Sequence, residues 1–187
     1  MIVNFVTGNK NKFEEAKRIL SQFGIGVKQI SIKIIEPKDN DIKEVSRIKA
    51  TQAFEKLNTT LFVEDAGLFI EALNGFPGAY SAFVYRTIGC EGILKLMEKE
   101  EARDAYFASS IAFISHSLKE PLIFYEEVTG KIAKEKRGVS GFGFDPIFIP
   151  NGYSKTFAEL GEEKDKVSHR SKALFKFAQF LLGISKN

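Results

Sequence analysis

Cysteine and histidine are scarce in this chain of 187 residues, which has one cysteine, Cys90, and two histidines, His116 and His169. A single cysteine excludes an internal disulfide, and the absence of a Cys/His cluster or an HExxH motif argues against a zinc site. The chain also lacks a charged-then-apolar leader and any apolar run of roughly 18 residues, the length that crosses a bilayer. We therefore expect a cytoplasmic protein that does not use a membrane.

A strong excess of charge is lacking as well. The chain has 27 lysines and arginines against 24 acidic residues, and the net charge of +3 is too mild to indicate a nucleic-acid partner. No repeat, low-complexity stretch or linker interrupts it. With 44% hydrophobic residues, the chain can bury a proper core, and we expect one domain over residues 1–187.

Apolar periodicity predicts an alternation of strands and helices. The expected helices are 10–23, 41–57, 79–87, 89–99 and 169–184, and the expected strands are 2–6, 26–35, 61–65, 68–71, 104–115, 121–133 and 146–149. The long strands 104–115 and 121–133 are close in sequence, which predicts an antiparallel hairpin and disfavours a purely parallel sheet. The fold class is therefore mixed α/β.

The first candidate site is a strand, a glycine turn and a helix opened by lysines. Thr7-Gly8-Asn9 forms the turn, and Lys10 and Lys12 stand where the helix begins. Backbone N–H groups at a helix N-terminus can hold a phosphate, although GxxxxGK[ST] is absent and this is no Walker A loop. Strand-turn-helix units with surface lysines are also common without any ligand.

Three carboxylates stand at expected strand ends. Glu64 and Asp65 close the strand 61–65, and since successive side chains on a strand point to opposite faces, only one of them can enter a given pocket. Glu36 follows an apolar strand. Mg²⁺ prefers one or two protein carboxylates together with substrate phosphate oxygens, so Glu36 and Asp65 are candidate ligands. The alternatives are a turn-forming Asp65 and a solvated Glu36.

Lys49 interrupts the apolar stripe of the expected helix 41–57, four residues after Val45 and four before Ala53. A lysine on such a stripe needs an anionic partner or a path for its head group to water. A phosphate oxygen or Glu36 would be a functional partner, and snorkelling is the alternative.

The run Ser140-Gly141-Phe142-Gly143-Phe144-Asp145-Pro146, with Lys164 and Ser168-His169-Arg170 downstream, brings together aromatic rings, a carboxylate and cations. These groups can stack a purine, read its polar edge and hold phosphate. Ser168 is typical of a helix N-cap, which puts His169 and Arg170 in the first helical turn. Cations there oppose the helix dipole, so we expect an anion to complete the site.

These blocks together resemble the inosine triphosphate pyrophosphatase family, also called XTP/dITP diphosphatases, nearly end to end. The blocks that carry the resemblance are Thr7-Gly8-Asn9 with Lys12, then Glu36, Glu44 and Lys49, then Glu64 to Leu68 through Phe76 to Ala82, then Gly141 to Phe148, and finally Thr156 to Leu160 with Glu163-Lys164 and Ser168 to Arg170. The resemblance implies a long twisted central sheet with two lobes flanking a cleft, and a homodimer.

The activity implied by the resemblance is Mg²⁺-dependent cleavage of non-standard purine nucleoside triphosphates such as ITP, dITP and XTP to the monophosphate and pyrophosphate. It implies Asp65 as general base and Glu36 with Asp65 as metal ligands. The residues implied to bind substrate are Thr7, Gly8, Asn9, Lys10, Asn11, Lys12, Lys49, Ala66, Phe142, Gly143, Phe144, Asp145, Lys164, His169 and Arg170. Ala66 stands where many relatives have Ser, so a contact there must come from its backbone.

The sequence is also compatible with other functions. A nucleotide-binding or sensing module would use the same pocket without turnover, and a broader phosphohydrolase would cleave other nucleotides. A Ser/His/Asp triad using His169 is possible on paper, but the chain has no GxSxG elbow.

Overall fold

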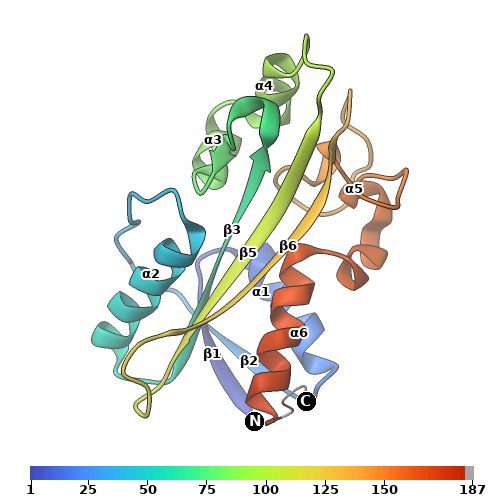
Figure 1. Cartoon of the computed structure of the whole chain (residues 1–187). Helices are drawn as coiled ribbons and strands as arrows, with labels where there is room; N and C mark the ends of the chain where they lie inside the picture. The colour runs from blue at the N-terminus through green and yellow to red at the C-terminus, as the bar shows by residue number, and fades with distance from the viewer. Residues whose placement is uncertain (184–187) are drawn as a thin grey trace. The chain divides into compact units, whose positions relative to one another are not determined.

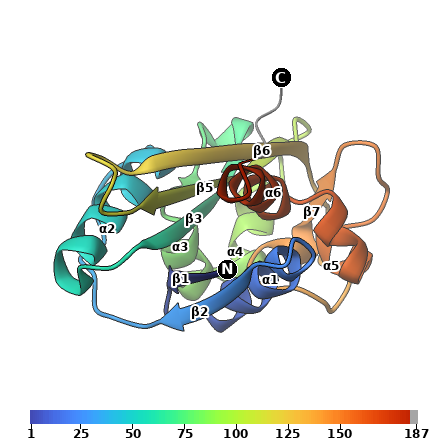
Figure 2. The ribbon, with the colours of Figure 1, turned by 90° about the horizontal axis from the view of Figure 1, so that it is seen from below.

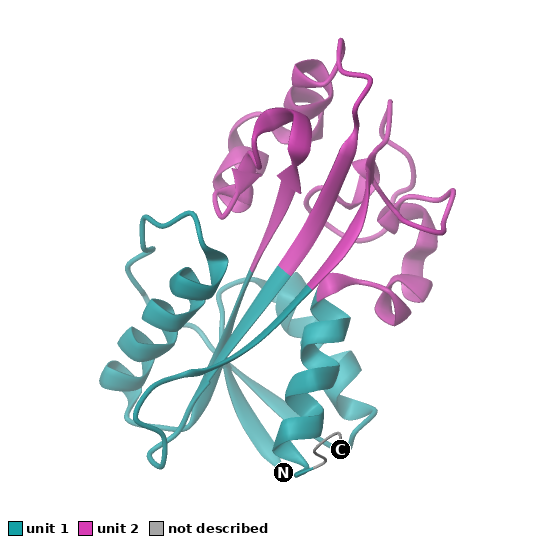
Figure 3. Ribbon diagram, in the orientation of Figure 1, with its two compact units in different colours: residues 1–65, 109–126, 170–187 teal, residues 66–108, 127–169 magenta. Residues whose placement is uncertain are grey.

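A computed structural model describes residues 1–183 and divides the chain into two compact units (Figure 3). Among the described residues, unit 1 consists of residues 1–65, 109–126 and 170–183, and unit 2 of residues 66–108 and 127–169. The single domain expected from the sequence stays a prediction.

The strands within the described residues form a seven-stranded mixed sheet (Figure 1). They are β1 (Ile2–Val6), β2 (Gly26–Ile30), β3 (Leu61–Ile70), β4 (Pro77–Gly78), β5 (Asp104–Ile114), β6 (Leu122–Ile132) and β7 (Phe148–Pro150). Their order is β2-β1-β3-β5-β6-β7, with β4 paired to β3. The pairs β1/β2 and β1/β3 are parallel, whereas β3/β4 and β6/β7 are antiparallel.

Helices follow or connect these strands. The α-helices are α1 (Lys10–Ser21), α2 (Ile42–Leu57), α3 (Ser81–Thr87), α4 (Gly89–Leu96), α5 (Phe157–Leu160) and α6 (His169–Leu181), and the 3₁₀ turns are η1 (Glu71–Leu73), η2 (Asp145–Ile147) and η3 (Gly161–Lys166). The mixed α/β class is confirmed. The expected hairpin is also present, since β5 and β6 are neighbours and residues 115–121 are too short for a parallel crossover, which needs about a dozen residues.

Several boundaries differ from the sequence prediction. The helices expected over 10–23 and 89–99 end at Ser21 and Leu96, the helix expected over 79–87 begins at Ser81, and the strand expected over 146–149 begins at Phe148. The strand expected over 26–35 ends at Ile30, because its partner β1 ends at the paired residue Val6. The strands expected at 61–65 and 68–71 are one continuous strand, β3. The expected helix 169–184 ends at Leu181, and its predicted last residue lies outside the described residues.

The short helix α5 and the turn η3 were not predicted. The sequence did carry a signal for α5, because Thr156 and Glu159 form a capping box: the Thr156 hydroxyl accepts from the Glu159 N–H, and the Glu159 carboxylate accepts from the Thr156 N–H. A helix of a single turn is too short to show periodicity.

Unit 1 packs helices on both faces of its part of the sheet (Figures 1 and 2). On one face, α1 and α6 bury apolar residues such as Leu20 and Phe177 against Phe5 and Phe62 of β1 and β3. On the other, α2 packs Ala50 and Ala53 against strand residues including Val63 of β3. Within unit 1, a side chain of β3 therefore faces either α1 and α6, or α2.

Unit 2 has its own core. Ile93 and Met97 pack with Phe107, Phe148 and other apolar residues of the unit's strands, and Phe157 from α5 joins them. Phe144 and Ile147 belong to this core, which anchors the loop of residues 134–147 within unit 2.

Candidate active site

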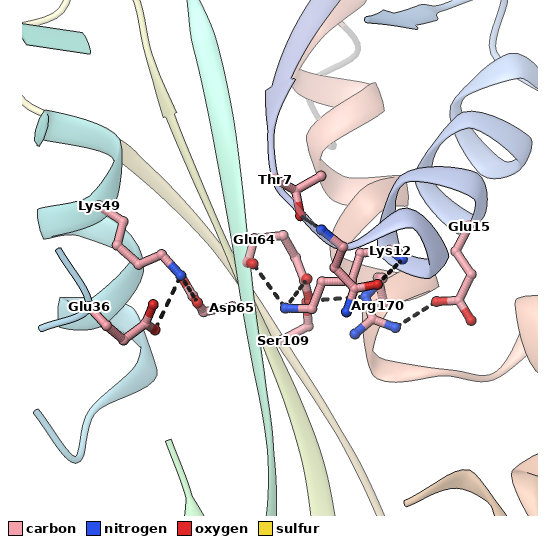
Figure 4. A network of polar contacts seen from close by, with 10 residues as sticks. Thr7, Lys12, Glu15, Glu36, Lys49, Glu64, Asp65, Ser109 and Arg170 are labelled. Atoms are coloured by element: carbon pink, nitrogen blue, oxygen red, sulfur yellow. Dashed lines mark hydrogen bonds and ion pairs between the residues drawn. The ribbon is translucent and has the colours of Figure 1, made fainter. Parts of the chain in front are cut away.

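Glu64 and Asp65 are consecutive in β3, and their carboxylates lie on opposite faces of the strand (Figure 4). Asp65 points toward Lys49 of α2, and Glu64 toward Lys12 of α1 and Arg170 of α6. The alternation predicted from the sequence is confirmed. It gives unit 1 two acidic positions with different partners.

Asp65 is held by a lysine that also reaches a second carboxylate. Lys49 Nζ lies 2.6 Å from Asp65 Oδ1 and 3.3 Å from Glu36 Oε1. Asp65 is buried, while the Glu36 side chain remains 69% exposed. Of the two alternatives for Lys49, the structure thus shows an anionic partner, and the ammonium group contacts both candidate metal ligands.

Burial and the two nearby lysines act on Asp65 in opposite directions. Burial disfavours the charged form and raises the pKa of Asp65, although the positive charges of Lys49 and Lys12 offset part of the rise. Burial lowers the pKa of Lys49, but the charges of Asp65 and Glu36 outweigh it, so the net shift is upward. Asp65 is therefore more basic than an ordinary aspartate and lies beside a lasting positive charge.

Glu64 is the centre of a second set of contacts. Its Oε2 lies 2.9 Å from Lys12 Nζ, while its Oε1 accepts hydrogen bonds from Ser109 Oγ at 2.7 Å and Arg170 Nε at 3.1 Å. Lys12 Nζ also donates to the Glu64 backbone carbonyl at 3.1 Å. Burial raises the pKa of Glu64, but the charges of Arg170 and Lys12 outweigh it and hold the pKa well below its usual range. Glu64 is thus a fixed anion.

Arg170 connects Glu64 to α1. Its Nη1 donates to Glu15 Oε2 at 2.6 Å, and the arginine itself is only 3% exposed. The anion expected for this cation is thus partly supplied by the protein, through Glu64 and Glu15. A contact of Arg170 with a purine stays a prediction.

The turn before α1 has the local structure expected of a helix N-terminus. Asn9 is the N-cap and its side chain accepts from the Lys12 N–H at 3.2 Å, while the Thr7 hydroxyl accepts from the Asn9 N–H at 3.1 Å. The first turn carries Lys10 and Lys12 and no acidic residue. The first N–H groups of α1 therefore lie in a positive environment, which suits an anion.

The donor set around Asp65 fits a hard divalent cation. Asp65 Oδ2 is buried, and no residue within the described chain donates a hydrogen bond to it. A buried carboxylate oxygen in that state needs a cation or a donor from outside the protein. In residues 1–183 no group of three or more His, Cys, Asp or Glu side chains is placed to hold a metal. Glu36 and Asp65 match the one or two carboxylates that Mg²⁺ takes from a protein.

In unit 2, Asp145 organises the loop that carries Phe142. Asp145 Oδ2 accepts from Lys164 Nζ at 2.7 Å and from the Phe142 N–H at 2.9 Å, and Lys164 Nζ lies 5.1 Å from the Phe142 ring centroid. Gly141 has a φ of +77°, and a Cβ there would collide with the Asp145 carboxylate. The loop thus needs glycine at this position.

The other residues expected at the base have different surroundings. Phe144 is 3% exposed and packs in the core of unit 2, and the buried His169 ring stacks on Phe107 with centroids 4.6 Å apart. Ala66 follows Asp65 in β3, and Gly143 has a φ of +63°. Phe142, by contrast, is only partly buried. Of the two phenylalanines singled out in the sequence, Phe142 keeps exposed surface for stacking.

Sequence reasoning assigned no role to Glu64, Ser109 or Glu15. Glu64 appeared only as the neighbour of Asp65 at a strand end and within a motif, and its pairing with Ser109 depends on β3 lying beside β5. A signal was present for Glu15, since a buried glutamate at the apolar face of α1 needs a cation. The sequence could not name Arg170 as that cation.

Comparisons with known proteins converge on one family. A sequence model of the Ham1 family matches residues 3–180. A "dITP/XTP pyrophosphatase" of Methanopyrus kandleri is 51% identical over 96% of both chains, and one of Thermococcus kodakarensis is 47% identical over 97% of both. The fold is similar to that of a Ham1 protein from Coxiella burnetii, with a TM-score of 0.85, 30% identity and coverage of 98% of this chain and 99% of that one. The Staphylococcus aureus Ham1 protein gives a TM-score of 0.83 at 29% identity, over 99% of this chain and 100% of that one.

Proposed function

The chain belongs to the Ham1 family, and we propose that it hydrolyses non-standard purine nucleoside triphosphates such as ITP, dITP and XTP to the nucleoside monophosphate and pyrophosphate. The names of relatives that match it over nearly their whole length support this activity. Such an enzyme removes deaminated purines from the nucleotide pool. Its chemistry requires a base for water and cations for the triphosphate.

The Asp65 carboxylate is the observation that carries the proposal. It is buried, its pKa is raised mainly by that burial, and its Oδ2 is without a hydrogen-bond donor among the described residues. Lys49 fixes the other oxygen at 2.6 Å. Asp65 accepts the proton of the water that attacks the anhydride between the α- and β-phosphates, so one water is consumed and pyrophosphate leaves.

Lysines and backbone N–H groups neutralise the polyanion. The turn Thr7-Gly8-Asn9 and the positive N-terminus of α1, from Lys10 through Asn11 to Lys12, bind phosphate oxygens together with Lys49 and Lys164. Lys12 and Lys49 each keep 17% of their side chain exposed while already held by a carboxylate. They are thus oriented before substrate arrives, which lowers the cost of ordering them on binding.

Glu36 and Asp65 hold Mg²⁺ in this proposal. When bound, the ion supplies a Lewis acid that stabilises charge on the phosphate oxygens. Glu36 is the more exposed of the two ligands, and it can move without disturbing the core.

At the base end, Phe142 stacks on the purine, and Gly143, Phe144, Asp145 and Ala66 shape its surroundings. Hypoxanthine and xanthine have a carbonyl oxygen at C6, to which His169 or Arg170 can donate, whereas adenine has an amino group there. A donor facing a donor rejects adenine, and such hydrogen-bonding sites discriminate by on the order of 10⁴. Stacking adds roughly 1–3 kcal/mol without choosing among purines.

Product analysis tests the proposal. ITP, XTP, dITP, GTP and ATP are each incubated with the protein, with and without Mg²⁺, and pyrophosphate is resolved from orthophosphate. We expect metal-dependent pyrophosphate from the first three and little from ATP or GTP. Orthophosphate would mean that a different bond is cleaved, and tight ITP binding without product would mean a sensing module.

We also expect a homodimer and a cytoplasmic location. Exposed aromatic residues gather in Phe76 to Tyr85 of unit 2, including Phe83 at 60% exposure, and this segment is the candidate dimer face. No helix of residues 1–183 has both the length and the apolar character of a membrane span. Light scattering of the purified protein, compared with a Phe83→Asp variant, tests the dimer.

A further inference from the structure

Ser109 and Ser110 are adjacent in β5 and fully buried, yet their hydroxyl groups serve different partners. Ser109 Oγ donates to Glu64 Oε1 at 2.7 Å. Ser110 Oγ lies 2.7 Å from Ser46 Oγ of α2. The two serines point to opposite faces of the sheet because side chains alternate along a strand. A substitution of Ser110 is therefore a suitable control for the same substitution of Ser109.

The Ser109 hydroxyl limits how the Glu64 carboxylate can rotate. The last side-chain torsion of a glutamate is broad, so the carboxylate plane is fixed only by its partners. Oε1 is held by Ser109 from β5 and by Arg170 Nε from α6 at 3.1 Å. With Oε1 held from two elements, Oε2 has one position, and that oxygen contacts Lys12 at 2.9 Å.

Lys12 is therefore held both at its side-chain ammonium group and at its backbone N–H. Its Nζ is bound by Glu64 Oε2 and by the Glu64 carbonyl oxygen at 3.1 Å, while its backbone N–H is bound by the Asn9 side chain. An ammonium group has three donors, and the Glu64 carbonyl oxygen accepts one of them, so donors remain for a phosphate oxygen beside the ion pair with Glu64 Oε2. The direction of these donors depends on where the Glu64 carboxylate lies.

We propose that Ser109 is a positioning residue for the triphosphate: it orients Glu64, and Glu64 in turn aims the Lys12 ammonium at a phosphate oxygen. The inference rests on the proposed function for its substrate. Ser109 does not itself touch substrate, so its effect on phosphate binding passes through Glu64 and Lys12.

A double-mutant cycle tests this dependence. Ser109→Ala, Lys12→Met and the double variant are compared with wild type in kcat and KM for ITP, and in the affinity for inorganic tripolyphosphate measured by calorimetry. Ser110→Ala is the matched control, because it removes the same atom from the next residue, and Ser46 retains its bond to the Lys43 carbonyl at 3.0 Å. Thermal unfolding of every variant is recorded.

We expect Ser109→Ala to lower kcat/KM and tripolyphosphate affinity about tenfold, and Ser110→Ala to change either by less than about twofold. In the Lys12→Met background, Ser109→Ala should have less than about a twofold further effect. Equal effects of the two serine variants, or a full Ser109→Ala effect without Lys12, would overturn the proposal. The comparison is made below the lowest unfolding temperature, so a loss of stability does not obscure it.

The failure of the proposed function has a different signature. If wild type releases no pyrophosphate from ITP but binds tripolyphosphate, the activity is wrong, and the calorimetric cycle still decides the link between Ser109 and Lys12.

Discussion

The Lys49 ammonium and the Asp65 carboxylate form a close ion pair, with Nζ 2.6 Å from Oδ1. The pair suits the general base that we propose. Burial raises the pKa of Asp65 and makes the carboxylate more basic, while the charge of Lys49 offsets part of that rise. Because Lys49 also contacts Glu36, a substitution of either carboxylate should change how Lys49 holds the other.

Replacing the proposed base should separate catalysis from binding. Asp65→Asn keeps the shape of the side chain but cannot accept the proton, so we expect pyrophosphate release to fall by about 10²–10⁴ while ITP still binds. Steady-state rates and calorimetric binding of ITP check this. Asp104→Asn, at an exposed aspartate that begins β5, is the control and should behave as wild type. Normal turnover by Asp65→Asn would remove Asp65 as the base.

The metal requirement should depend on Glu36. Glu36→Gln removes one charged ligand, and we expect the Mg²⁺ concentration for half-maximal rate to rise about tenfold, because Mg²⁺ takes only one or two carboxylates from the protein. Chelation with EDTA should stop pyrophosphate release by wild type, and added Mg²⁺ should restore it. Glu55→Gln, at an exposed glutamate of α2, is the control. An unchanged Mg²⁺ requirement in Glu36→Gln would contradict its role as a ligand.

The strand β1 and the start of α1 could be predicted from the sequence because their signals are local. The residues 2–6 predicted β1, and the turn Thr7-Gly8-Asn9 before an amphipathic stretch predicted the start of α1. Alternation along β3 likewise predicted that Glu64 and Asp65 face opposite sides. In each case the deciding interaction joins residues a few positions apart.

Partners across the sheet could not be predicted. The position of Lys49 indicated an anionic partner or a path to water, yet the choice of Asp65 depends on how α2 lies on β3. The contact of Ser109 with Glu64 depends on the pairing of β3 with β5, and that of Arg170 with Glu15 on α6 packing beside α1. These distances are set by tertiary packing, about which a single sequence carries little information.

Replacing Arg170 tests whether this arginine recognises the purine base or only stabilises the fold. We expect Arg170→Ala to use ITP more weakly and to have a lower ITP-to-ATP ratio of kcat/KM, because a donor to the C6 carbonyl is lost. It should also lower the unfolding temperature, since Glu64 and Glu15 lose their shared cation. Glu15→Gln, which loosens Arg170 without removing it, is the comparison. An unchanged ratio in a destabilised Arg170→Ala would assign the arginine to structure alone.

The Phe142 loop should depend on glycine at position 141. Gly141→Ala requires a left-handed backbone that costs about 1–2 kcal/mol for other residues, and its Cβ would also collide with the Asp145 carboxylate. Gly152→Ala is the matched control, because Gly152 has a φ of +85° and open space around its Cβ position. We expect only Gly141→Ala to raise the KM for ITP, and its unfolding temperature to be the lower of the two. Equal KM values would show that the loop tolerates the collision.

The acid stability of the protein should depend on Glu64. Its folded-state pKa lies well below the unfolded value of about 4.3, so its ionisation stabilises the fold above that pH, and the contribution is lost as the pH falls toward the folded-state pKa. Glu64→Gln leaves Lys12 and Arg170 without their shared carboxylate, and we expect a loss of about 3–5 kcal/mol at pH 7. Below about pH 4 the difference in the free energy of unfolding between wild type and Glu64→Gln should narrow. Protonation of Glu64 then removes from wild type the ion-pair stabilisation that the variant already lacks. Urea unfolding at a series of pH values measures both effects, with the exposed Glu14→Gln as control. A gap that stays constant down to pH 2 would show that the ionisation of Glu64 does not stabilise the fold.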